Sequence, residues 1–79
     1  MTESASGGSY SNVVVSPVMA GSPPFRIVQV YGEVAGRAHD VVDVLHLLRA
    51  VGIPHPDLDD PSVVRWEGGD KFTWGLRHK

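Results

Sequence analysis

Residues 40–51 are the one long segment of this chain in which apolar residues recur with a helical period. The apolar positions are three and four residues apart and form a single stripe of Val41, Val44, Leu45, Leu48 and Val51. Asp40 stands where an N-cap residue belongs, and Asp43 follows it at capping-box spacing. Gly52 and Pro54 give a strong stop signal. The chain is therefore expected to contain one helix.

Two further apolar residues, Val42 and Leu47, flank this stripe. They widen the apolar arc to more than half of the helix circumference, which exceeds what one sheet face normally covers. We therefore expect either the N-terminal arm or a second molecule to cover the remainder.

Two valine-rich stretches before the helix predict strands. In the first, at residues 12–18, Pro17 either ends the strand or restricts it to a sheet edge. The second, at residues 25–34, is apolar at both alternating sets of positions, which favours a central strand covered on both faces. Gly32 inside it predicts a bulge or a bend.

After a Pro- and Asp-rich loop at residues 54–61, residues 63–76 are predicted to form a β-hairpin. A loop of Gly68, Gly69 and Asp70 would pair Trp66 with Phe72 and Val64 with Trp74. This register places the apolar and aromatic side chains together on one face, so it is preferred over a two-residue Gly-Gly loop.

The predicted order of elements is ββαββ, in which two β-hairpins pack on one helix. This α+β arrangement resembles the order of the β-grasp and protein-G-like folds in topology only. The expected organisation is a flexible polar N-terminal arm at residues 1–10, one domain at 11–76 and a basic tail at 77–79. No sequence motif of a known family is present from which functional residues could be taken.

The chain has 79 residues, no cysteine and a formal net charge of −2. This excludes a disulfide framework and a cysteine-based zinc finger, and it gives no global attraction to nucleic acid. No apolar run approaches the ~20 residues of a membrane helix, and no signal peptide is recognisable. We expect a protein located in the cytoplasm or in a virion assembly, since thirteen valines against two isoleucines favour a GC-rich bacterial or phage source.

Few residues offer catalytic or metal-binding chemistry. His39, Asp43 and His46 have helical spacing and are ligand types that zinc accepts, with His55 in the next loop as a further candidate. A solvated polar helix face explains the same spacing, so no metal and no cofactor is predicted. The serines lie in turns and in the polar arm, without a nucleophile motif, so no catalytic residues are assigned and a non-enzymatic protein is predicted.

The leading hypothesis is a protein–protein interaction or structural assembly module that binds a partner or itself. A domain this small gains little stability from its own core, which favours association. Residues 13–18 could add to the sheet edge of a neighbour. The candidate partner-binding residues are Val13, Val14, Val15, Val42, Leu47, Trp66 and Trp74.

The alternative hypothesis is a small nucleic-acid-binding regulator. In the preferred hairpin register, Arg65 and Lys71 share the outer face, and Arg77 and Lys79 follow in the tail. Basic residues on a β-ribbon can contact phosphates. The aromatic residues would point to the other face, so stacking platforms for bases are not expected there.

Overall fold

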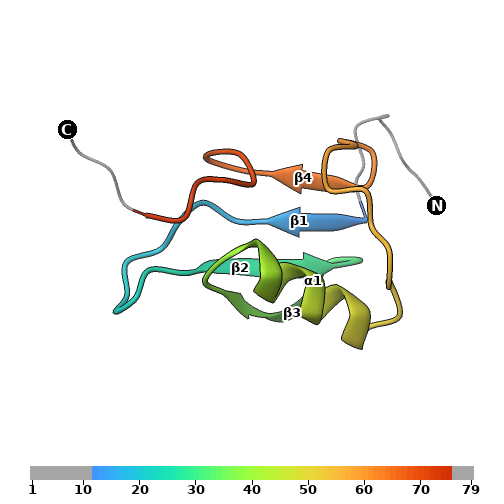
Figure 1. The fold of residues 1–79 in the computed structure, drawn as a ribbon, viewed down its shortest axis with the longest axis horizontal. Coiled ribbons are helices and arrows are strands. Elements are labelled where there is room, and N and C mark those ends of the chain that lie inside the picture. The colour runs from blue at the N-terminus through green and yellow to red at the C-terminus, as the bar shows by residue number, and fades with distance from the viewer. Residues whose placement is uncertain (1–11, 76–79) are drawn as a thin grey trace.

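A computed structural model describes residues 12–75 of the chain. Its elements in chain order are β1 (Val13–Val15), β2 (Arg26–Val30), β3 (Glu33–Ala38), α1 (Val41–Ala50) and β4 (Val64–Trp66) (Figure 1). The predicted α+β class, with four strands and one helix, is confirmed. The predicted arm at 1–10 and tail at 77–79 lie outside the described residues.

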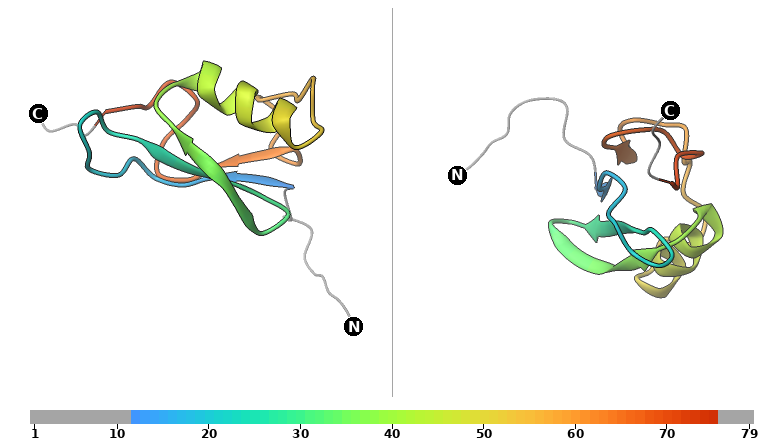
Figure 2. Two further views of the ribbon diagram at one scale, coloured as in Figure 1. Left: turned by 90° about the horizontal axis from the view of Figure 1, so that it is seen from below. Right: turned by 90° about the vertical axis from the view of Figure 1, so that its left-hand side faces the viewer.

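The four strands form one mixed sheet in the order β3-β2-β1-β4. β1 pairs with β2 in the antiparallel sense and with β4 in the parallel sense. Because β1 and β4 are parallel, the chain must cross from one end of the sheet to the other before it enters β4. The helix α1 and its flanking loops make this crossover between β3 and β4. Figure 2 shows α1 against one face of the sheet, and in residues 12–75 no second helix covers the opposite face.

The core lies between α1 and the inward side of the sheet. Its buried apolar residues are Val13, Val15, Val28, Val30, Ala38, Val44, Leu48 and Val64. Alternate strand residues point to this face, and the helix contributes Val44 and Leu48 one turn apart. Small and β-branched side chains dominate, so the helix can approach the strands closely.

The predicted ends of the helix are confirmed. Asp40 is the N-cap, and its side chain accepts a hydrogen bond from the Asp43 backbone N–H at 2.9 Å. The Asp43 carboxylate in turn accepts from the His39 backbone N–H at 2.9 Å. At the other end, Gly52 has a φ of 93° and the Ile53 N–H donates to the Leu48 carbonyl at 2.8 Å, as in a Schellman motif.

The single strand predicted for residues 25–34 is wrong, because this segment is a hairpin. Tyr31 and Gly32 have φ values of 52° and 83°, which give the two-residue turn that joins β2 to β3. The bend expected at Gly32 is confirmed by this turn, and a separate bulge lies further on, where the register shifts opposite Val28 and Gln29 and leaves Ala35 as the extra residue. Gln29 remains partly exposed, so β2 is covered on one face rather than on both.

Gly36 follows this bulge and lies beneath the helix. A Cβ atom at position 36 would stand 2.8 Å from a terminal methyl carbon of Leu47. The missing side chain therefore allows Leu47 to pack directly on β3. This contact uses part of the wide apolar arc of the helix, whereas Val42 remains 51% exposed.

The predicted C-terminal hairpin is also wrong. β4 is present, but residues 67–75 form a loop, so Phe72 and Trp74 do not pair with Trp66 and Val64. The physical reason is that the carbonyl groups of this segment bind the side chain of Arg26 instead of a neighbouring strand.

The prediction that residues 13–18 extend a neighbour's sheet is wrong as well. β1 has a strand on each side, so its backbone groups are already used within the sheet. Pro17 follows β1 and ends it, which confirms the first of the two alternatives predicted for this residue.

Candidate functional site

Arg26 is completely buried, although it is a charged residue. It is the first residue of β2 and lies in the alternating set of Val28 and Val30, so its side chain enters the core side of the sheet. There it extends toward residues 67–73, which we call the Phe72 loop. The strand therefore places a cation beneath a loop that is distant in sequence.

All five N–H groups of the Arg26 guanidinium have backbone carbonyl acceptors. Nε donates to Ser16 at 2.7 Å. Nη1 donates to Asp70 and Thr73, both at 2.7 Å. Nη2 donates to Glu67 at 3.0 Å and to Gly69 at 3.5 Å. Four of the five acceptors belong to the Phe72 loop, so one side chain binds four carbonyl groups of that loop.

Two tryptophan rings enclose the guanidinium. Its carbon lies 5.2 Å from the ring centroid of Trp66 and 5.2 Å from that of Trp74, within cation–π range. The two rings meet edge to face at 6.3 Å. Burial lowers the pKa of Arg26 and the Asp70 carboxylate opposes this, and the group stays protonated at any physiological pH.

Internal hydrogen bonds also hold the Phe72 loop. The Asp70 carboxylate accepts from the Phe72 backbone N–H at 2.9 Å and from the Thr73 hydroxyl at 3.1 Å. These two bonds hold the pKa of the Asp70 carboxyl below its ordinary value, and the bond from the Phe72 N–H has the larger effect. The Trp74 indole N–H donates to the Lys71 carbonyl at 2.6 Å. The loop is therefore held both by its own hydrogen bonds and by those of the buried Arg26 side chain.

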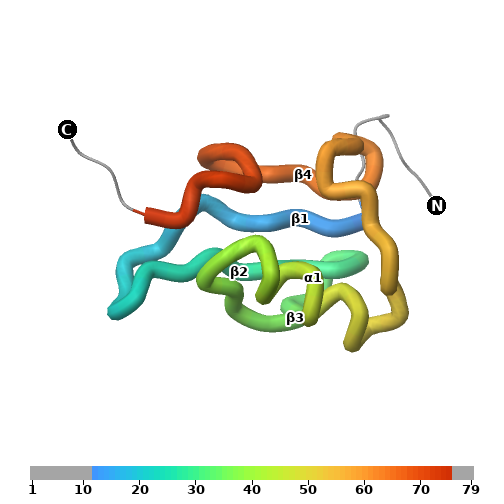
Figure 3. The backbone as a smooth tube through the Cα atoms, in the orientation of Figure 1, coloured from blue at the N-terminus to red at the C-terminus, as the bar shows by residue number. Residues whose placement is uncertain are grey.

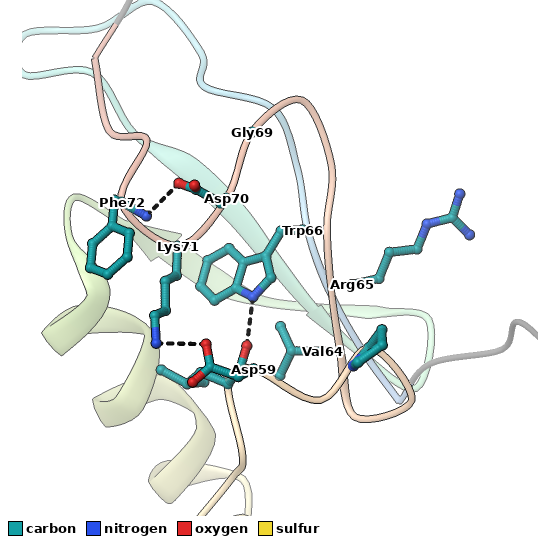
Figure 4. A pocket seen from close by; sticks show the side chains of 10 residues that line it. Asp59, Val64, Arg65, Trp66, Gly69, Asp70, Lys71 and Phe72 are labelled. Carbon is teal, nitrogen blue, oxygen red and sulfur yellow. Dashed lines mark hydrogen bonds and ion pairs between the residues drawn. The ribbon is translucent and has the colours of Figure 1, made fainter.

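The side chain of Phe72 points outward from this fixed loop and is 78% exposed. Beside it lies a shallow groove of about 520 Å³, which we call the β4 groove (Figure 4). Its lining residues are Leu58, Asp59, Pro61, Val64, Arg65, Trp66, Gly69, Asp70, Lys71 and Phe72. Figure 3 shows the two loops that bound it, one at each end of β4.

Two contacts join the loops around the β4 groove to each other and to β4. The Trp66 indole N–H donates to the Leu58 carbonyl at 2.9 Å. Lys71 Nζ and Asp59 Oδ1 form an ion pair at 2.6 Å (Figure 4). These two contacts connect the loop before β4 both to β4 and to the Phe72 loop.

The predicted partner-binding residues do not form one surface. Val13 and Val15 are fully buried in the core, and Val14 is partly exposed on the opposite sheet face. Val42 is exposed on the helix, whereas Leu47 packs on β3. Trp66 and Trp74 do lie together, as the partly buried walls around Arg26.

The basic residues predicted for nucleic-acid binding are also separated. Arg65 forms an ion pair with Glu67 at 3.4 Å, and Lys71 pairs with Asp59. Figure 4 shows the Arg65 side chain pointing away from Lys71, because the expected hairpin face does not form. Arg77 and Lys79 lie outside the described residues.

The histidine spacing on the helix does not produce a metal site in the described part of the chain. His39 Nδ1 lies 3.4 Å from Asp43 Oδ2, while His46 is exposed further along α1. Across residues 12–75, no group of three or more histidine, cysteine or acidic side chains is placed to hold a metal ion.

Sequence reasoning missed Arg26 and placed Phe72 on the apolar face of a hairpin, paired with Trp66. The signal for Arg26 was present, because it shares the alternating set of Val28 and Val30 and two tryptophans occur later in the chain. No local signal distinguishes Phe72 from its aromatic neighbours, since its exposure follows from the path of the whole loop.

Comparisons with protein-family models, with curated proteins and with solved structures found no match. Among the described residues, no helix has the length and apolar character to cross a membrane. The geometry of the site is therefore the basis for the functional proposal.

Proposed function

We propose that this domain is a non-enzymatic protein-interaction module that binds a partner through the β4 groove, with Phe72 as the apolar anchor. The observation that carries the proposal is the 78% exposure of Phe72 on a loop that Arg26 fixes from below.

Leaving Phe72 exposed costs folding free energy. Burying a phenylalanine side chain contributes roughly 1.5–3 kcal/mol to folding, and this chain forgoes most of that gain at position 72. A flexible tip could leave an aromatic residue exposed by chance, but the backbone of residues 70–73 is hydrogen bonded internally. An exposed aromatic residue on a fixed backbone is the arrangement that binding hot spots use.

The surroundings of Phe72 support a protein ligand. Leu58, Pro61 and Trp66 supply apolar walls within reach of an inserted side chain. Because internal contacts join the loops around the groove, a partner would have little backbone to order, which lowers the entropic cost of binding.

The direct test is selection of ligands from a random peptide library displayed on phage, with the folded chain immobilised. We expect enriched peptides to bind the wild-type chain and to bind Phe72→Ala about 30-fold more weakly, as hot-spot truncations of about 2 kcal/mol do. Tyr31→Ala is the matched control, since Tyr31 is an exposed aromatic residue in the β2–β3 turn. It should bind within about threefold of wild type.

Two results would contradict the proposal. One is a library in which no sequence is enriched over an unrelated protein. The other is a set of enriched peptides whose affinities fall equally in Phe72→Ala and Tyr31→Ala. Circular dichroism of each variant checks that the fold is retained.

A further inference from the structure

The floor of the β4 groove is the edge of a strand. β4 lies at one end of the sheet and pairs only with β1 among residues 12–75. Its three residues, Val64–Trp66, all line the groove. The ligand site therefore contains backbone as well as side chains.

The register of the parallel pair determines which backbone groups face the groove. The Val13 N–H donates to the Val63 carbonyl at 3.1 Å, and the Glu67 N–H donates to the Val15 carbonyl at 2.9 Å. Backbone groups of alternate strand residues point to opposite sides, so residues 63, 65 and 67 face β1. The N–H and C=O of Trp66 and the C=O of Val64 then face the groove, while the Val64 N–H donates to the Asp60 carbonyl at 3.0 Å.

The charges around the groove are compensated internally. Lys71 pairs with Asp59, and Arg65 pairs with Glu67. The Asp70 carboxylate is engaged by hydrogen bonds within its own loop. A polyanion would have to break these pairs to bind, whereas an uncharged backbone with apolar side chains complements the groove as it stands.

We propose that the occupant of the β4 groove is an extended, uncharged segment of a partner protein, which adds as a strand beside β4. This inference rests on the proposed function and names the class of partner. One residue of the segment exchanges two backbone hydrogen bonds with Trp66. Its neighbours alternate in direction, so one apolar side chain packs on the groove wall that Trp66, Lys71 and Phe72 form, where Lys71 Nζ lies 5.3 Å from the Phe72 ring centroid.

The dimensions of β4 limit the length of the paired segment. Three residues of strand span roughly 10 Å, and loops bound both ends (Figure 3). The added strand therefore pairs over about three residues, and the apolar contact with Phe72 supplies specificity.

The experiment uses a peptide selected by the phage library and measures amide hydrogen exchange in the full chain by NMR. In the free chain, the Trp66 amide should exchange at least tenfold faster than the Arg65 amide, which faces β1. Peptide binding should slow the exchange of the Trp66 amide by at least tenfold and leave the exchange rate of the Arg65 amide unchanged. N-methylation of successive peptide amides should weaken binding tenfold or more at alternate positions only, as strand pairing requires.

The outcomes separate this inference from the proposed function. If Phe72→Ala abolishes binding but Trp66 is not protected and N-methylation shows no alternation, the interaction module stands and strand addition is overturned. If the Trp66 amide already exchanges slowly in the free chain, the chain's own residues occupy the edge of β4, and strand addition by a partner is overturned. A concentration-dependent dimer that is lost in Phe72→Ala would assign the groove to a second copy and overturn the proposal of a separate partner.

Discussion

The guanidinium carbon of Arg26 lies 5.2 Å from the ring centroid of Trp74, and its Nη1 donates to the carbonyl of the preceding residue, Thr73. A residue at the start of β2 thus fixes the last described segment of the chain. This contact places the outward side of the Phe72 loop, and with it the proposed binding surface. The interior and the surface of this domain are therefore connected through one side chain.

Replacing Arg26 with lysine should destabilise the fold strongly. Lysine keeps the charge but cannot reproduce the planar set of five donors, so several buried carbonyl groups lose their partners. We expect the free energy of unfolding to fall by about 2–4 kcal/mol in urea denaturation. Arg37→Lys is the matched control, because Arg37 is an exposed arginine over the Phe25 ring, and it should change stability by less than about 1 kcal/mol. Equal losses in the two variants would show that the buried donors of Arg26 are unimportant.

The contact between Gly36 and Leu47 predicts a coupled pair of substitutions. Gly36→Ala places a methyl group 2.8 Å from Leu47 and should cost about 1–3 kcal/mol of unfolding free energy. In a Leu47→Ala background the same change meets no clash, so its cost should fall by about 1 kcal/mol. A double-mutant cycle of denaturation midpoints measures this coupling. Strict additivity would mean that Leu47 does not pack on Gly36.

The Asp70 carboxylate predicts a loss of stability in acid. Its pKa is lowered in the folded chain, mainly by the Phe72 N–H and then by the Thr73 hydroxyl, from an ordinary value of 3.8. A lowered folded-state pKa gives stability that is present above the unfolded value and is lost as pH falls through the folded value. Thermal midpoints should therefore be level at neutral pH and fall below about pH 4.

Asp70→Asn should flatten this acid dependence, because the amide keeps an acceptor oxygen but does not titrate. The pKa of Asp60 is lowered in the same direction by the hydroxyl and backbone N–H of Ser62, so some dependence should remain. Thermal midpoints of both chains across the acid range, at constant ionic strength, provide the comparison. Identical pH profiles for wild type and Asp70→Asn would contradict the assignment.

The helix could be predicted because its signals are local. Asp40 and Gly52 take their expected capping roles, and the Asp43 carboxylate accepts from the His39 N–H, one residue before the N-cap position that a capping box uses. The β2–β3 turn was missed because Tyr31 adopts a positive φ, which is uncommon for a bulky residue. A pattern of alternating residues does not reveal where such a residue reverses the chain.

The candidate site was harder to predict because it depends on contacts between distant residues. The alternation of residues 63–76 is compatible with a hairpin. A loop forms instead because the buried guanidinium of Arg26 needs carbonyl groups as hydrogen-bond acceptors. Trp66 was predicted to bind a partner, whereas its contacts in the structure are with Arg26 and Leu58. Compensating a buried charge is a property of the assembled fold, so no short window of sequence contains it.

We expect Arg26 to make the loop that displays Phe72 rigid. Amide hydrogen exchange at Phe72 and Thr73 tests this most directly, because both N–H groups are hydrogen bonded to Asp70. In the wild-type chain both amides should exchange at least about 100-fold more slowly than in an unstructured peptide. In Arg26→Lys this protection should fall to about tenfold or less, under conditions where the Leu48 amide in α1 stays protected. Wild-type amides at 72 and 73 that exchange at the rate of an unstructured peptide would contradict the account.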